Sequence, residues 1–181
     1  MVLGTKELLR LVKEKNLIEN LSERELQNPE GAGFDLRIGK VFILEGESFL
    51  GREQRKTPKA KPVAEYHPSD IQTIILKPGE YLLTESVEKI NMPLDMFGIV
   101  KPRSTLFRSG IVLRAGVIDP GYSGQLHPLL HNVSHSPMKI ELGARYIHIF
   151  FHKVQGDIHS SYRGQWQGGR VSTNGQKEKQ V

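Results

Sequence analysis

Short apolar runs separated by turn-forming residues fill most of this chain, and they restrict its fold more than any other feature. Phe34-Asp35-Leu36-Arg37-Ile38 alternates apolar and polar residues, as a half-buried strand does. Further short runs follow at residues 41–44, 71–76, 81–84, 96–100, 111–113, 125–130, 139–142 and 146–151. Turns recur about every ten residues, which is typical of a β-barrel or jelly roll. We therefore predict a mainly β domain.

The ends of the chain and one internal segment depart from this pattern. Thr5 can cap an N-terminal helix whose apolar residues, Leu8, Leu9, Leu11 and Val12, have helical spacing. Residues 51–64 are charged and contain two prolines, which predicts a surface excursion or lid. Residues 170–181 are polar and predict a mobile tail. We expect one domain over residues 1–169, which agrees with the length of the chain.

The composition excludes several classes of protein. The chain has no cysteine, so disulfides, thiol nucleophiles and cysteine-ligated zinc sites are excluded. No run approaches the ~18 apolar residues that a membrane span needs. The first 15 residues are amphipathic and lack a signal-peptide pattern, so we expect a cytoplasmic protein without membrane contact.

The formal net charge of +5 fits either a solvated basic surface or an anionic ligand such as a nucleotide. Much of the excess lies at residues 52–61 and in the tail from residue 170 onward. No basic stripe with interleaved aromatic residues occurs, which argues against a nucleic acid partner.

The segment of residues 101–108, KPRSTLFR, contains donors that suit a polyphosphate. Arg103 and Arg108 supply guanidinium forks, and Ser104 and Thr105 supply hydroxyl groups. The same residues also fit a strand end that turns into a capped helix. Both interpretations can hold, because helix N-termini bind phosphate.

The segment of residues 116–124, GVIDPGYSG, places Asp119 after two apolar strand residues. By itself this is most often a hairpin turn. In the functional interpretation Asp119 faces a pocket and polarises a water, and Tyr122 offers a flat face to a sugar.

Taken together, the two segments resemble the paired central motifs of the dCTP deaminase/dUTPase superfamily. AGFDLR at residues 32–37 resembles the first motif of the family, and LGARYIH at 142–148 resembles the fourth, with His148 where trimeric dUTPases usually have Gln. YRGQWQG at 162–168 resembles the tail motif of the deaminase branch. The five motifs occur in the family's order over roughly residues 3–172, which is far more specific than any one motif.

The resemblance implies a distorted jelly-roll subunit in a homotrimer, with sites between subunits that bind a deoxynucleoside triphosphate and magnesium. It assigns Asp119 a place near the sugar and the α-phosphate, and Tyr122 a place behind the deoxyribose. The residues that match the phosphate-binding motif are Arg103, Ser104, Thr105 and Arg108. The residues that lie in the tail, which closes over nucleotide in this family, are Tyr162, Gln165 and Trp166.

The positions at which this chain differs from the deaminase branch indicate whether it is a deaminase or a diphosphatase. The glutamate that serves as proton shuttle in that branch falls on Leu129, which cannot transfer a proton. His127 is the titratable residue nearest to Leu129. In the tail motif, Gln165 and Gly169 also differ from the residues that the deaminase branch commonly has at these positions. A zinc deaminase is excluded because its cysteine pair is missing. His127, His131 and His135 would lie ~13 Å apart at successive steps of a strand, too far to share a metal ion.

We therefore predict a magnesium-dependent dUTP diphosphatase of the archaeal type, with Asp119 activating water. Uracil would be recognised mainly by backbone beyond Gly124, along Gln125, His127 and Leu129. Asp35 would support either the metal's water shell or the fold. Two alternatives stay open: a dCTP deaminase, alone or bifunctional, and a non-catalytic nucleotide sensor.

Overall fold

Strands make up most of the computed structural model, which describes residues 1–180. The helices are α1 (Thr5–Lys15), α2 (Glu23–Gln27) and α3 (Ser104–Arg108). The strands are β1 (Ile18–Glu19), β2 (Phe34–Glu45), β3 (Phe49–Leu50), β4 (Gln54–Lys56), β5 (Lys59–Glu65), β6 (Thr73–Leu76), β7 (Tyr81–Ser86), β8 (Lys89–Asn91), β9 (Met96–Pro102), β10 (Ile111–Arg114), β11 (Val117–Ile118), β12 (Ser123–Gln125), β13 (Leu129–Asn132), β14 (Met138–Glu141), β15 (Arg145–Lys153) and β16 (Glu178–Lys179).

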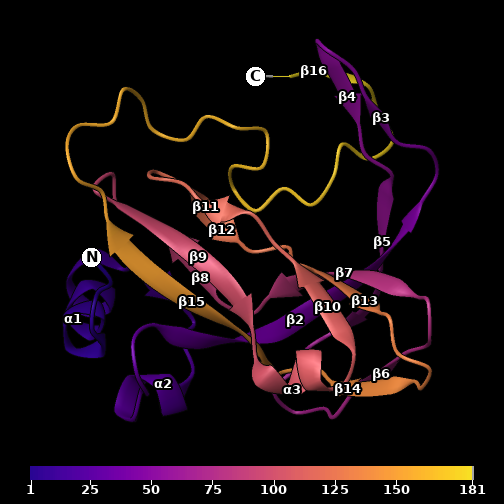
Figure 1. The fold of residues 1–181 in the computed structure, drawn as a ribbon, viewed down its shortest axis with the longest axis horizontal. Coiled ribbons are helices and arrows are strands. Elements are labelled where there is room, and N and C mark those ends of the chain that lie inside the picture. Colours follow the sequence, from indigo (N-terminus) through magenta and orange to yellow (C-terminus); the bar gives the residue numbers. More distant parts are fainter. Residues whose placement is uncertain (181) are drawn as a thin grey trace.

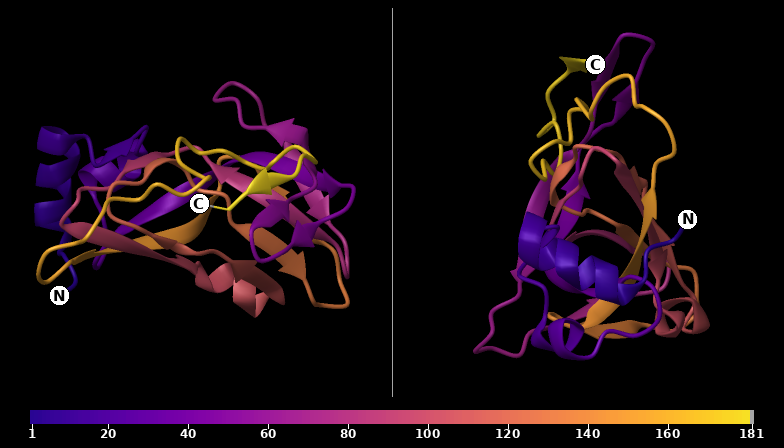
Figure 2. Two further views of the ribbon diagram at one scale, coloured as in Figure 1. Left: turned by 90° about the horizontal axis from the view of Figure 1, so that it is seen from above. Right: turned by 90° about the vertical axis from the view of Figure 1, so that its left-hand side faces the viewer.

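The long strand β2 organises the largest sheet, whose order is β10-β13-β7-β2-β15-β9-β11. Its first residues pair with β15, and its later residues pair with β7 and β5. Register shifts occur in each of these pairings, and such irregularities bend a strand and increase its twist. The sheet consequently curls into part of a barrel, as the end-on view in Figure 2 shows.

Three smaller sheets complete the β structure: β1-β8-β12, β14-β6 and β16-β4-β3. The core fills the inside of the curl, because strands such as β9 alternate buried and less buried residues. Phe34, Tyr146 and Phe151 are among the largest fully buried side chains. Helix α1 lies at one end of the curled sheet and buries Leu8 and Leu11 against it (Figures 1 and 2).

The mainly β architecture with an N-terminal helix agrees with the sequence prediction, but several details differ. The cap of α1 is Gly4, and Thr5 is the first helical residue. Helix α2 was not predicted, although Ser22 caps it through a hydrogen bond from the backbone of Glu25. The run at 125–130 is divided between β12 and β13, since Pro128 has no N–H to donate to a ladder.

The predicted excursion and tail are both more ordered than their composition indicates. The excursion contains β4 and most of β5, and Pro62 lies beside the register shift against β2, where a missing N–H is tolerated. In the tail, Thr173 is buried and β16 pairs with the edge of β4. Pairing with a distant strand edge is a tertiary effect that local composition does not reveal.

No helix within residues 1–180 is long and apolar enough to cross a membrane.

Candidate active site

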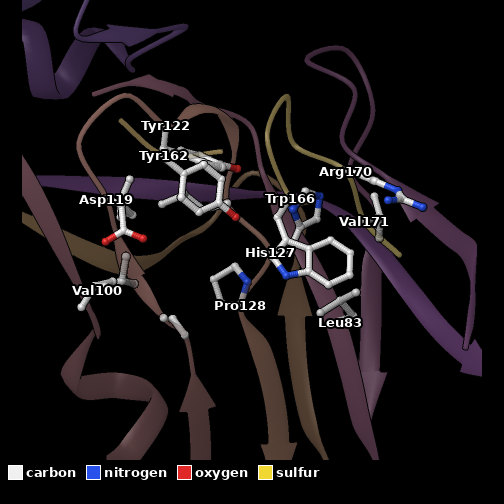
Figure 3. Close-up of a pocket in the computed structure, with 15 residues that line it drawn as sticks. Leu83, Val100, Asp119, Tyr122, His127, Pro128, Tyr162, Trp166, Arg170 and Val171 are labelled. Atoms are coloured by element: carbon white, nitrogen blue, oxygen red, sulfur yellow. The ribbon is translucent and has the colours of Figure 1, made fainter. Parts of the chain in front are cut away.

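A cavity of about 260 Å³ lies between the turn that follows β11 and the C-terminal segment. Figure 3 shows its lining side chains, with Asp119 at one side, Tyr122 and Tyr162 in the middle, and His127 and Trp166 at the other side. The lining comes from residues distant in sequence: Leu83, Val100, residues 115–119, Tyr122, residues 126–128, Tyr162, Trp166, Arg170 and Val171.

The turn at residues 119–124 is shaped by its glycines. Tyr122 N donates to Asp119 O at 3.1 Å, and Gly121 adopts a φ of +84°, which only glycine reaches without strain. A Cβ on Gly124 would lie 2.2 Å from the backbone nitrogen of Gly169. Glycine at this position is therefore needed for the C-terminal segment to pack on the turn.

Asp119 has an exposed carboxylate at the pocket. It forms no side-chain hydrogen bond or ion pair with any other residue in the range 1–180. An uncommitted carboxylate can accept a proton from water or a hydrogen bond from a ligand. Of the sequence candidates, Asp119 has the setting that a general base requires.

Tyr122 forms a buried wall of the same pocket. Its hydroxyl donates to Gln125 O at 2.5 Å, and its ring meets Tyr162 edge-on with the centroids 5.6 Å apart. Burial raises the pKa of Tyr122 to about 12. The phenol consequently stays neutral, and the ring offers an apolar surface to a bound group.

The C-terminal segment is fastened to the turn by its backbone and by Gln167. Gly168 N donates to Ser123 O at 2.8 Å, and Tyr162 N donates to Pro120 O at 2.8 Å. The amide of Gln167 accepts from Ser123 N and donates to Gly121 O. The tail motif thus lies over the Asp119 turn of its own chain.

Trp166 and Gln165 leave this segment in different directions. Trp166 lines the pocket, and the guanidinium of Arg55 in β4 lies 4.2 Å from its ring centroid. Gln165 instead donates to Lys179 O at 2.7 Å, in the last strand. Arg55 was missed by sequence reasoning because nothing near it in sequence marks a contact with residue 166.

His127 lines the pocket from the segment between β12 and β13, and its Nε2 lies 3.0 Å from Glu85 Oε2 in β7. Glu85 was also missed from the sequence, because only the pairing of β13 with β7 brings it there. Leu129 is half-buried opposite Leu83 and does not line the cavity. Gln125 contacts the C-terminal segment, where Gly169 packs against it.

The candidate phosphate residues lie elsewhere in the chain. Ser104, Thr105 and Arg108 are exposed on the short helix α3, and none of them lines the Asp119 pocket. Arg103 precedes this helix and pairs with the carboxylate of Asp35. One chain therefore does not bring the two central motifs together.

Asp35 is the centre of a cluster of cationic and N–H groups. Besides Arg103, its carboxylate accepts from Arg145 at 3.0 Å and from His148 Nδ1 at 2.8 Å. His148 Nε2 faces Ala32 O at 2.8 Å. Buried Glu25 accepts from the Asp35 backbone and completes the cluster. These contacts place Asp35 where it orients Arg103.

The donor set around Asp35 does not fit a metal ion, because the groups that surround its carboxylate oxygens are themselves donors. Within residues 1–180, no three His, Asp or Glu residues are grouped so that they could hold a metal directly. Magnesium commonly keeps several waters and binds through substrate phosphates, which does not need a protein cage.

Comparisons of the sequence with known proteins agree on one family. The sequence model of the family described as "dCTP deaminase-like" matches residues 2–154. The dCTP deaminase of Pyrococcus furiosus is 31% identical over 157 residues, covering 87% of this chain and 88% of the relative. The probable deoxyuridine 5'-triphosphate nucleotidohydrolase of Aeropyrum pernix is 33% identical over 138 residues, covering 76% of this chain and 83% of the relative.

A solved structure agrees with the fold. The crystal structure of 2'-deoxycytidine 5'-triphosphate deaminase from Agrobacterium tumefaciens matches with a TM-score of 0.65 at 20% identity. The match covers 84% of this chain and 48% of that chain, so this chain spans about half its length. The likeness confirms the predicted mainly β fold.

Proposed function

The chain belongs to the dCTP deaminase-like family, and within that family we propose that it hydrolyses dUTP to dUMP and diphosphate. The observation that carries this proposal is the uncommitted carboxylate of Asp119 at a pocket walled by Tyr122. The position of the deaminase glutamate holds Leu129, which has no proton to give or take.

In the proposed reaction, Asp119 orients a water and accepts its proton as the water oxygen bonds to the α-phosphorus. The bond from that phosphorus to the oxygen bridging the α- and β-phosphates breaks, and the electron pair leaves with diphosphate. Asp119 later returns the proton to solvent. General-base assistance of this kind contributes ~10²–10⁴ in rate.

The phosphates would be bound by Arg103, Ser104, Thr105 and Arg108. These residues are remote from the pocket in one chain, so we propose that a second chain supplies them in a homotrimer. Asp35 would hold Arg103 in place through their ion pair. Guanidinium groups and hydroxyls fixed in this way stabilise charge that develops on the phosphates.

The nucleoside would occupy the cavity itself. Tyr122 would back the deoxyribose, and the segment of residues 126–128 would line the space for uracil, with Trp166 closing over it. Magnesium would enter with the nucleotide, bound to phosphate oxygens whose charge it offsets.

The second candidate function is dCTP deamination, which the name of the Pyrococcus furiosus relative favours. Product analysis separates the two. Purified protein should release diphosphate and dUMP from dUTP, and should release no ammonia from dCTP. Ammonia from dCTP would replace our proposal with the deaminase, and binding of dUTP without products would indicate a nucleotide sensor.

A further inference from the structure

The charged excursion of residues 51–64 contacts the wall of the nucleoside pocket through one side chain, Arg55 of β4. Its Cζ atom lies 4.2 Å from the ring centroid of Trp166, which lines the cavity. Arg55 itself does not line the cavity, so it contacts the indole from outside. A guanidinium at this distance over an indole is attracted by the π-electrons of the ring. Arg55 therefore supports the aromatic residue that lies at one side of the pocket (Figure 3).

Arg55 is itself held in place by the strands around it. β4 pairs with both β3 and β16, which places Arg55 opposite Leu50 and Glu178. Both Nε and Nη2 of Arg55 donate to Glu178 Oε1 at 3.1 Å, and the two side chains are only 14% and 22% exposed. Such charge-assisted bonds are stronger than an ion pair that water screens. The guanidinium that contacts Trp166 consequently has a fixed position in the free protein.

The backbone around Trp166 is anchored on both sides, but these anchors do not act on the indole ring. Gln165 Nε2 donates to a carbonyl of β16 at 2.7 Å, and Gln167 accepts from Ser123 N at 2.8 Å. Both bonds fix the course of the chain and leave the choice of rotamer at residue 166 to other contacts. Arg55 is the charged group that contacts the ring itself, so it restricts the position of the indole.

We propose that Arg55 is a positioning residue for the nucleotide, which holds the indole of Trp166 at the pocket before the nucleotide binds. The inference rests on the proposed function, in which Trp166 closes over the nucleoside. A side chain that is already held in its bound position loses less conformational entropy on binding, and this favours affinity. Arg55 acts through Trp166, and its effect is on binding rather than on the chemical step at Asp119.

The test compares Arg55→Leu, which removes the cation, with Arg55→Lys, which keeps the charge and loses the planar fork. Arg52→Leu, in the exposed turn of the same hairpin, is the control. Trp166 is the only tryptophan of the chain, so tryptophan emission reports on it alone. In the free protein, Arg55→Leu should make this emission more sensitive to quenching by acrylamide. Binding of the α,β-imido analogue of dUTP, measured by calorimetry, should weaken ~5–30-fold. Arg55→Lys should lose less, and Arg52→Leu should match wild type in both measurements.

A double-mutant cycle tests whether Arg55 acts through Trp166. Trp166→Ala should itself weaken binding of the analogue, and Arg55→Leu added to it should have a further effect of less than about twofold. Equal factors in the two backgrounds would overturn the inference. Unchanged quenching and affinity in Arg55→Leu, shown by thermal unfolding to be folded, would overturn it too.

Steady-state rates separate this inference from the proposed reaction. In Arg55→Leu, KM for dUTP should rise while kcat stays within about twofold of wild type, which is the pattern when binding common to the ground state and transition state is lost. A fall in kcat at unchanged KM would contradict the inference. Quenching and calorimetry need no turnover, so a wild type that binds the analogue but fails to hydrolyse dUTP would refute the proposed reaction and leave the result on Arg55 intact.

Discussion

Asp119 offers the most direct test at the level of single residues. Asp119→Asn keeps the shape of the side chain and removes the proton acceptor, so kcat for dUTP should fall ~10²–10⁴-fold. The carboxylate is exposed and unpaired within residues 1–180, so stability should change by less than about 0.5 kcal/mol. Diphosphate release and thermal unfolding measure the two effects.

Asp157→Asn is a matched control, because Asp157 is also exposed but does not line the pocket. It should leave both the rate and the stability unchanged. Comparable rates for the two variants would remove Asp119 from the reaction.

Glu88 provides a prediction about pH. Burial raises the pKa of Glu88 above its ordinary value of 4.5, although hydrogen bonds from Arg37 oppose the shift. A group whose folded pKa is raised stabilises the fold below its unfolded pKa, and this contribution is lost as pH rises through the folded value. The stability of wild type relative to Glu88→Gln should therefore be greatest in acid and decline towards neutral pH. Denaturant unfolding of both proteins across this range checks the sign, and a difference that grows with pH would contradict it.

Motif spacing identified residues that the fold does gather, but it could not identify all of their partners. Asp119, Tyr122, His127, Tyr162 and Trp166 line one cavity in the structure. Their contacts with Glu85 and Arg55 depend on strand pairing between distant segments, which no local pattern encodes.

At the level of elements, the C-terminal tail is held by the hairpin of β3 and β4. Thr173 N donates to Thr57 Oγ1 at 2.8 Å, and Thr57 N donates to Thr173 Oγ1 at 2.9 Å. The carboxylate of Glu178 accepts a hydrogen bond from Arg55, whose guanidinium also lies over the ring of Trp166. Glu178 also forms an ion pair with Arg170 at 2.8 Å. The last residues thereby fix the position of Trp166.

Deletion of residues 170–181 should remove this support while leaving the β core intact. We expect a lower kcat/KM for dUTP and a smaller change in Trp166 fluorescence on binding of the imido analogue. Glu178→Gln should show the same effects more weakly, and exposed Gln176→Ala should show neither. Unchanged activity in the truncated protein would mean that the tail has no role in closing the site.

Elements with a strong periodic pattern were predicted, whereas those stabilised by partners were not. Helix α1 and strand β9 follow apolar spacing that is visible in the sequence. The strands β5 and β16 are polar or contain proline, and they form because β2 and β4 offer edges to pair with. Tertiary pairing overrides local composition at these positions.

For the whole molecule, the separation of α3 from the Asp119 pocket has a direct consequence. If the phosphate residues and Asp119 serve one reaction, at least two chains must contribute to each site. We expect light scattering at micromolar protein to give the mass of a trimer. A monomeric mass in an active preparation would exclude the shared site.

Subunit mixing tests the shared site itself. Arg103→Ala should abolish phosphate binding, and Asp119→Asn should abolish water activation, so each variant alone should be nearly inactive.

In a trimer formed from equal amounts of both, a site is complete when its Arg103 comes from the Asp119→Asn chain and its Asp119 comes from the Arg103→Ala chain. Random assembly with one such contact per site makes about a quarter of the sites complete. Co-refolded variants should therefore regain about a quarter of wild-type dUTP hydrolysis. Sites built within one chain would regain none, because every chain would still carry a defect, and mixing the folded trimers without unfolding them provides the matching control.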